Sequence, residues 1–335
     1  MARATLKTIA EQTGFSITTV SRALKDGPEV KPDTIQQVKE VATELGYRPN
    51  TSGIGLKTGQ TFVLALIIPF IRPGDVIGDV GTLSLIEGLT AGISDTDYHL
   101  TVIPRNPEED DLAPVRHVVE KGLADGVILT STLVNDKRIP YLHEKKVPFV
   151  TFGRTELATP HPWYDIDNAD FVYQAARHLY QRGRKNLLLL TPSPEFMYGW
   201  HRITGFRRAA HEFGIQIDDQ RSVLIESDSD DHRVFVEQAC AWDNPPDGYI
   251  CGTEVAALVI SSTLQNQGMR PGVDVDVVTM ETSRLAEFYH PPMTAFKEDL
   301  HYAGRLLSSL LLRALAGEPA SDLQVLDRLT ITERG

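Results

Sequence analysis

Short apolar segments recur along the chain from residue 61 onward, and amphipathic segments separate them. The apolar segments are rich in Val, Ile and Leu and only a few residues long, which is typical of buried strands. Strands are predicted over residues 62–68, 99–104, 126–130, 148–152, 186–191, 248–251 and 275–280. The longest continuous apolar segment, residues 62–71, is too short to cross a bilayer, so we expect no membrane contact.

The segments between these strands have the length and spacing of helices. Helices are predicted over about 81–93, 111–121, 168–182, 200–213, 232–241 and 254–267. Alternating strands and helices predict parallel sheets covered by helices, and the chain length divides them into two doubly wound α/β lobes. We expect the chain to cross between the lobes near 155–162 and 290–292. The predicted body, residues 61–335, has one lobe at about 61–156 and 293–320 and the other at about 160–290 and 322–335.

Residues 1–50 have a different pattern, which predicts a separate all-helical head. Thr5 is placed to cap a first short helix and Ser16 a second one. The tight connection between them contains Gly14, which accepts a turn conformation, and the two helices therefore predict a helix-turn-helix. A third helix is expected from residue 32 to 45, closed by Gly46.

The second helix presents a polar face to solvent. Helical spacing directs five side chains away from the helical core: Ile17, Thr18, Ser21, Arg22 and Lys25. An arginine can donate two hydrogen bonds to a guanine edge, and hydroxyl groups bind phosphates. This face therefore suits the major groove of DNA. An ordinary solvated helix is the alternative that these residues alone leave open.

The distribution of charge favours the nucleic-acid interpretation. The whole chain has a net charge of −12, but residues 1–60 carry +2 and the remainder −14. A basic head on an acidic body indicates an anion-binding module joined to a second unit. The two cysteines make no disulfide framework, and no signal-peptide pattern opens the sequence, so we expect a cytoplasmic protein.

Residues 5–50 resemble the DNA-binding head of the LacI/GalR family of bacterial repressors. The motifs T-L-x-x-I-A, G-x-S-x-x-T-V-S-R-x-L and L-G-Y-x-P-N occur in that order and at the family's spacing. The resemblance implies a homodimer that binds a palindromic operator. Beyond the exposed face of the second helix, it implies DNA contacts from Thr5, Ser16, Thr19, Tyr47 and Asn50. Lys31 stands where the family usually has a serine cap, which weakens the third helix by about 1 kcal/mol.

The segment GIGLKTG, residues 53–59, has the composition of a phosphate-binding loop. Such a loop follows a strand and opens a helix, whereas this segment precedes a strand and lacks the Walker spacing. The resemblance implies instead that residues 51–60 are a hinge, with Leu56 wedged into the minor groove. Gly53 and Gly55 each cost about 1 kcal/mol of helix stability, so we expect a hinge that orders on DNA. A plain flexible linker is the alternative.

The resemblance extends to the body, which is similar to periplasmic sugar-binding proteins and implies an effector bound beyond the carboxyl ends of the strands. It places Arg202, before a Gly-Phe pair, and Glu281, where the family has Asp, on sugar hydroxyls. Arg154 follows a predicted strand and either faces the ligand or pairs with Asp165 or Asp167. The further candidates are Thr253, Trp200 and Asp79.

No other motif in the sequence carries clear chemistry. G-x-S-x-G, H-E-x-x-H and C-x-x-C are absent, and residues 226–232 lack the spacing of a calcium loop, so we expect neither a cofactor nor a metal. We therefore expect a ligand-responsive repressor of carbohydrate-utilisation genes with a sugar-type effector, and not an enzyme. The alternatives are an α/β enzyme with a DNA-targeting head, a regulator with a purine-type effector and a sugar-transport receptor.

Overall fold

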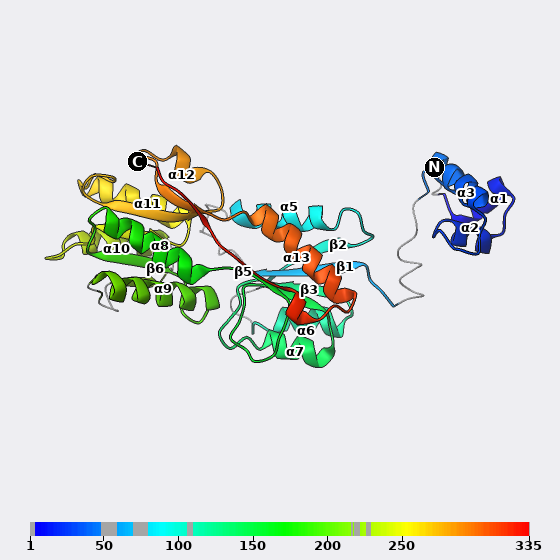
Figure 1. Ribbon diagram of the computed structural model, residues 1–335, viewed down its shortest axis with the longest axis horizontal. Coiled ribbons are helices and arrows are strands. Elements are labelled where there is room, and N and C mark those ends of the chain that lie inside the picture. The colour runs from blue at the N-terminus through cyan, green and yellow to red at the C-terminus, as the bar shows by residue number, and fades with distance from the viewer. Residues whose placement is uncertain are drawn as a thin grey trace. The chain divides into compact units, whose positions relative to one another are not determined.

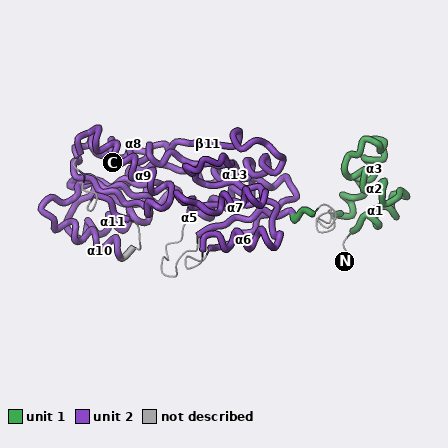
Figure 2. Tube along the Cα trace, turned by 90° about the horizontal axis from the view of Figure 1, so that it is seen from below, with its two compact units in different colours: residues 1–61 green, residues 62–335 purple. Residues whose placement is uncertain are grey.

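The computed structural model of the chain forms two compact units, residues 1–61 and 62–335 (Figures 1 and 2). It describes residues 4–47, 59–69, 80–105, 110–215, 217, 222–225 and 229–334. Most of the predicted hinge, including Gly53, Gly55 and Leu56, lies outside the described residues, as do Asn50 and Asp79.

The first unit contains the three predicted helices, α1 (Leu6–Thr13), α2 (Ile17–Ala23) and α3 (Pro32–Glu44). The Thr5 and Ser16 side chains cap α1 and α2 by accepting hydrogen bonds from backbone N–H groups. Gly14 ends α1 with φ 74°, a conformation that favours glycine, and Lys31 begins α3 without a side-chain cap. The centre of the unit is filled by Ile9, Val20, Ala23, Val38 and Ala42.

The first lobe of the second unit has a six-stranded parallel sheet with the order β11-β5-β4-β3-β1-β2. Its strands are β1 (Val63–Pro69), β2 (His99–Arg105), β3 (Gly126–Leu129), β4 (Phe149–Phe152), β5 (Trp163–Ile166) and β11 (Gln324–Asp327). Its helices are α5 (Val80–Gly92), α6 (Ala113–Glu120), α7 (Arg138–Lys145), α13 (Leu300–Leu315) and the short 3-10 helix η1 (Ala320–Asp322). Leu64 and Leu66 of β1 pack with α5 and α13, whereas Ala65 and Ile67 pack with α6 and α7, so helices cover both faces.

The second lobe repeats this plan with the strand order β12-β10-β9-β8-β6-β7, in which only β12 is antiparallel to its neighbour. Its strands are β6 (Leu187–Thr191), β7 (Val223–Ile225), β8 (Gly248–Cys251), β9 (Asp276–Glu281), β10 (Thr294–Lys297) and β12 (Thr330–Thr332). Its helices are α8 (Asn168–Gln181), α9 (Met197–Phe213), α10 (Ser229–Cys240), α11 (Glu254–Asn266) and α12 (Leu285–Phe288). The two lobes and the helical head confirm the predicted fold class.

The chain crosses between the lobes later than the sequence predicted. The residues of strand β5 were placed in the second lobe, but β5 pairs with β4 and β11 in the first sheet, so the first crossing follows Ile166 rather than 155–162. Strand β10 was placed in the first lobe but pairs with β9 in the second. Strand β11 was placed in the second lobe but belongs to the first. These strands are only four residues long, and their partners are distant in sequence, so local pattern does not reveal which sheet they join.

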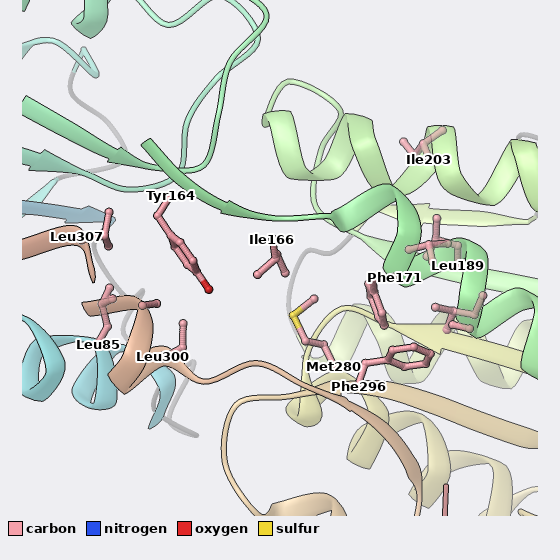
Figure 3. Close-up of a cluster of buried hydrophobic side chains, with 14 of the residues drawn as sticks. Leu85, Tyr164, Ile166, Phe171, Leu189, Ile203, Met280, Phe296, Leu300 and Leu307 are labelled. Atoms are coloured by element: carbon pink, nitrogen blue, oxygen red, sulfur yellow. The ribbon is translucent and has the colours of Figure 1, made fainter. Parts of the chain in front are cut away.

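One hydrophobic cluster continues from the first lobe into the second. Figure 3 shows Tyr164, Leu85 and Leu300 of the first lobe on one side, with Ile166 and Met280 between them and Phe171 and Phe296 of the second lobe. All of these side chains are at most 8% exposed. Because burial of each such side chain contributes about 1.5–3 kcal/mol, the crossing is part of the core and not a flexible joint.

Helices α5 and α13 approach each other closely through small residues. A Cβ atom added to Gly88 would meet the His301 backbone, and one added to Gly304 would meet the backbone of α5 at Leu85. The Ser308 hydroxyl donates a 2.8 Å hydrogen bond to the Leu89 carbonyl across the same contact. The short distance between the two helices therefore requires glycine at positions 88 and 304.

We expect Gly304→Ala to lower the free energy of unfolding by about 1–3 kcal/mol, because the added methyl group forces backbone against backbone. Denaturant unfolding followed by circular dichroism measures the change. Ser309→Ala, on the exposed side of the same helix, is the matched control and should stay within about 0.5 kcal/mol of the unmodified protein. Equal stability of both variants would contradict this account of the contact.

Candidate DNA-contact face and effector cavity

The exposed face of α2 carries most of the predicted base-reading side chains. Ile17, Thr18, Arg22 and Lys25 are exposed and Ser21 is half-buried, while the opposite face of the helix enters the core of the head. Helix α2 is thus held by its apolar face, and its opposite face presents two hydroxyl groups and a guanidinium, with the ammonium group of Lys25 just beyond the helix. This is the composition with which a helix can bind both base edges and phosphates in a major groove.

Arg22 has a weak partner within the head. Its Nε lies 3.3 Å from a carboxylate oxygen of Glu29, and both side chains are about half exposed. An exposed ion pair of this kind contributes at most about 1 kcal/mol. The guanidinium can therefore exchange Glu29 for a nucleic-acid acceptor at little cost.

The remaining predicted DNA contacts have structural tasks in the head. Thr5 and Ser16 accept the capping hydrogen bonds of α1 and α2, and the Thr19 hydroxyl lies 2.8 Å from the Ser16 hydroxyl. Tyr47 is half-buried and packs against the hydrophobic centre of the head. In the structure, these residues position α1 and α2.

The second unit contains a cavity of about 220 Å³ at the carboxyl ends of β1, β3, β4 and β5. Helices α5, α8 and α9 and the connection from β10 to α13 complete its wall, so both lobes contribute. Its lining residues are Ile68, Pro69, Gly81, Thr82, Leu85, Thr130, Ser131, Phe152, Gly153, Asp165, Ile166, Asn168, Tyr198, Arg202, Glu298 and Leu300. Ligands of open α/β sheets bind at this edge of the strands, and a mixed apolar and polar wall is typical of small-molecule sites.

Arg202 enters this cavity from α9 and is only 6% exposed. Its Nε donates a 2.9 Å hydrogen bond to the Asn168 side-chain oxygen. The guanidinium carbon lies 5.5 Å from the centre of the Tyr198 ring and 5.7 Å from that of Phe171. These contacts fix the plane of the guanidinium group at the cavity wall.

Asp165 lies at the end of β5 and is almost fully buried in the cavity wall. Its carboxylate is 3.5 Å from Nη1 of Arg154 and 3.5 Å from the side-chain nitrogen of Asn168. Burial raises the pKa of Asp165 to about 7, although the Arg154 charge opposes this rise. The predicted Arg154 thus takes the second of its two expected roles, an ion pair with Asp165.

A buried ion pair shapes the loop after β3. Arg138 and Asp136 are nearly inaccessible to solvent and 2.6 Å apart. The Arg138 guanidinium also donates to the carbonyl groups of Thr130 and Ser131, two residues of the cavity wall. Ser131 has φ 52°, a conformation that is uncommon for a residue with a side chain. The pair therefore holds a loop conformation that the local sequence does not favour.

A short antiparallel bridge joins this loop to the loop before α9, across the two lobes. The Val134 N–H donates to the Glu195 carbonyl, and the Met197 N–H donates to the Thr132 carbonyl, each at 2.9 Å. The lobes are thus connected beside the cavity by main-chain hydrogen bonds as well as by the crossing strands.

Glu281, expected to bind the ligand, is not part of the cavity wall. It is 2% exposed at the end of β9, where its carboxylate accepts hydrogen bonds of 3.2 and 2.9 Å from Arg334. A buried carboxylate needs such a partner, and the arginine is 53 residues away, so sequence spacing does not reveal it. The structure thus gives Glu281 an ion pair in place of the predicted position on the cavity wall.

Thr253 and Trp200 are also absent from the cavity wall. Thr253 caps α11 by accepting from the Ala256 N–H, and Trp200 is 43% exposed on α9. The sequence analysis in turn missed Asn168 and Glu298 as lining residues. A signal for Asn168 existed, because the segment D-I-D-N ends β5 and begins α8, but strand β5 itself was not predicted.

Among the described residues, no three His, Cys, Asp or Glu side chains are grouped so that they could hold a metal ion. Within the same residues, no helix has the length and apolar character to cross a membrane.

The raised pKa of Asp165 predicts a pH dependence of stability. The folded protein binds the Asp165 proton more tightly than the unfolded chain, whose aspartate has a pKa near 3.8. The stabilisation that protonated Asp165 gives the folded protein is therefore complete below pH 3.8 and is lost as the pH rises to about 7. We expect the unfolding free energy of the unmodified protein minus that of Asp165→Asn to fall over this range and then to level off. Asp243→Asn, at an exposed position, controls for loss of a surface carboxylate; a pH-independent difference for Asp165→Asn would contradict the assignment.

Two family models match the chain. Residues 5–50 match the model described as bacterial regulatory proteins, lacI family. Residues 82–332 match the model described as periplasmic binding proteins and sugar binding domain of LacI family. The first match covers the helix-turn-helix and the second covers the body that contains the cavity.

Individual proteins resemble the chain over nearly its whole length. It is 30% identical over 319 residues to the HTH-type transcriptional regulator AglR of Rhizobium meliloti (strain 1021), covering 93% of this chain and 88% of that protein. It is 28% identical to the HTH-type transcriptional regulator RafR of Escherichia coli, covering 96% and 94%. The lac repressor dimer bound to operator and the anti-inducer ONPF matches with a TM-score of 0.78 at 18% identity, covering 99% of this chain and 98% of that one. At that identity the structural match shows a shared fold.

Both AglR and RafR are named as HTH-type transcriptional regulators, and neither is named as an enzyme. The helix-turn-helix head, the two-lobed body and the family matches over both together show that this chain is a transcriptional regulator of the LacI family.

Proposed function

We propose that this regulator represses carbohydrate-utilisation genes, binds a palindromic operator as a homodimer and responds to a sugar-type effector in the cavity between its lobes. The observation that carries the proposal is the cavity wall, in which a buried and oriented Arg202 faces a mixed polar and aromatic surface. Because operator DNA is the site of action, we place the protein in the cytoplasm.

The chemistry of the wall supports a sugar. A guanidinium can donate two parallel hydrogen bonds to neighbouring oxygen atoms, and the carboxylates of Asp165 and Glu298 are acceptors for hydroxyl groups. Tyr198 and Phe152 provide aromatic surface for the apolar C–H faces of a sugar ring. The family model over residues 82–332 is itself described as a sugar-binding domain. A purine-type effector is the competing proposal, and the experiment below distinguishes it from a sugar.

The head supports operator binding. The exposed face of α2 supplies one reading surface, and two copies related by a two-fold axis would read the two halves of a palindrome. We propose that residues 51–60 act as the hinge, with Leu56 in the minor groove. We propose that Arg22 binds base edges. The residues around it on the same surface are Ile17, Thr18, Ser21 and Lys25.

The connection between the lobes suggests how the effector acts. An effector shifts a conformational equilibrium only if it binds the two states with different affinity. Separation of the lobes would break the main-chain bridge of Val134 and Met197 and divide the cavity wall. A ligand that contacts both lobes therefore favours the closed arrangement, and this arrangement determines how the hinges are presented to DNA.

The proposal is tested by fluorescence anisotropy with DNA from the intergenic region beside the protein's own gene. Mono- and disaccharides, sugar phosphates and purines are added at fixed salt, since affinity for DNA depends strongly on ionic strength. Tight sequence-preferring binding that a sugar changes at least about tenfold supports the proposal. If only purines change DNA binding, the proposed sugar effector is wrong. If the protein binds all DNA sequences equally, the proposed operator binding is wrong.

We expect Arg22→Ala to weaken specific operator binding by about 1–3 kcal/mol and to change non-specific binding much less, because a base contact is lost. Anisotropy with operator and scrambled duplexes measures both affinities. Lys39→Ala removes an exposed positive charge from α3, outside the α2 face, and is the matched control. Equal losses for the two variants would mean that Arg22 acts only through its charge.

We expect Arg202→Gln to reduce sugar affinity at least about tenfold, because hydrogen bonds to a charged group contribute about 1.5–3 kcal/mol. Operator affinity without sugar should be retained, since Arg202 lies in the second unit. Isothermal titration calorimetry measures the first quantity and anisotropy the second. Arg207→Gln, exposed on the same helix, should leave both unchanged; unchanged sugar affinity in Arg202→Gln would exclude the cavity as the effector site.

A further inference from the structure

We propose that Glu29 is a specificity-determining residue of the DNA-contact face, because it competes with DNA phosphates for Arg22 and so lowers the affinity for DNA that offers Arg22 no guanine. This inference rests on the proposed operator binding by α2. It adds to that proposal a residue outside α2, and a physical reason why the head distinguishes its operator from other DNA.

The turn after α2 folds back toward the end of that helix. The N–H groups of Lys25 and Gly27 both donate to the Arg22 carbonyl, at 3.1 and 3.0 Å. A Cβ atom added to Gly27 would lie 3.0 Å from a carboxylate oxygen of Glu29 and 3.1 Å from the Arg22 carbonyl oxygen. Because glycine has no side chain, the Glu29 carboxylate can approach the turn and reach the Arg22 guanidinium, whose Nε lies 3.3 Å away.

The backbone on both sides of Glu29 is attached to the rest of the head. The Asp26 carboxylate accepts hydrogen bonds of 2.6 and 2.8 Å from Nζ of Lys39 on α3. Val30 packs against the hydrophobic centre of the head, and its N–H donates to the Gly27 carbonyl at 2.9 Å. The Glu29 side chain is exposed, but the turn therefore holds its backbone beside the reading face of α2.

Two other acids of the head have a lysine as their partner. A carboxylate oxygen of Glu11 lies 3.9 Å from Nζ of Lys7, and Asp26 pairs with Lys39. Glu29 differs from both, because its partner is the arginine that is proposed to bind base edges. The charge of Glu29 therefore acts on the reading side chain itself.

The two kinds of DNA acceptor differ in how well they replace Glu29 as a partner of Arg22. A guanine edge presents two acceptors, N7 and O6, which match two N–H donors of a guanidinium group. A phosphate attracts the guanidinium by its charge, but salt weakens this attraction and the nearby Glu29 carboxylate repels the phosphate. A guanine edge is uncharged and meets no such repulsion. Glu29 therefore weakens phosphate binding more than guanine binding, and an unfavourable interaction with the wrong site increases specificity.

The test begins with selection from a DNA duplex library that is randomised over two helical turns, with the unmodified full-length protein. The enriched duplex and a scrambled duplex of the same composition are then the probes for fluorescence anisotropy at a series of salt concentrations. We expect Glu29→Gln to raise the affinity for the scrambled duplex at least about threefold and to change the affinity for the enriched duplex less. The dependence of scrambled-duplex affinity on salt should steepen by about one logarithmic unit per head, since Arg22 gains a phosphate contact.

Two controls test whether Glu29 acts through Arg22. Glu44→Gln removes an exposed acid from α3 and should leave the ratio between the two affinities unchanged. In an Arg22→Ala background, Glu29→Gln should change the affinity for the scrambled duplex less than it does in the unmodified protein, because no guanidinium is released. Thermal unfolding of each variant confirms that it is folded before the affinities are compared.

The outcomes separate this inference from the proposed function. Selection that enriches no sequence contradicts operator binding itself and, with it, the inference. If a sequence is enriched but Glu29→Gln changes neither the affinity ratio nor the salt dependence, the inference is wrong and the proposed operator binding stands. An equal effect of Glu29→Gln with and without Arg22 also overturns the inference, because Glu29 would then act as a general negative charge.

Discussion

The cavity at the carboxyl ends of β1, β3, β4 and β5 depends on the burial of the crossing segments between the lobes. Ile166, Met280 and Phe296 lie in one hydrophobic cluster that extends from the α5–α13 side of the first sheet to the α8–α9 side of the second. Because the crossing is packed as core, the carboxyl ends of the first sheet's strands are held opposite α9. Asp165 of the first lobe and Arg202 of the second therefore line one cavity.

Several buried charged side chains of the body form ion pairs with each other. Arg138 pairs with Asp136 in the loop after β3, and Arg334 pairs with Glu281 at the end of β9. A buried charge without a partner is strongly destabilising, so these pairs fix loops and strand ends that the hydrophobic core alone would leave undefined. Asp165 and Arg202 on the cavity wall are likewise held by Arg154 and Asn168.

The sequence predicted the head more completely than the body. Caps at Thr5 and Ser16, the turn at Gly14 and the exposed face of α2 all depend on residues within a few positions of one another, and the structure has them as predicted. In the body, the strands with long Val-Ile-Leu runs were recognised, whereas β5, β10 and β11 were missed or placed in the wrong lobe. Helix α13 was not predicted, although its leucines have helical spacing.

The sequence by itself determined a helix-turn-helix head and an α/β body, because periodicity, capping and motif spacing are local properties. The family resemblance pointed to Arg202, which lies on the cavity wall. Only the tertiary structure decided which acids face the cavity. Glu281 and Asp165 both end strands, but Arg334 neutralises the first from the far end of the chain while the second enters the cavity wall. The roles of the two acids differ because their partners differ. Strand order and packing determine those partners, and the neighbouring residues in the sequence do not reveal them.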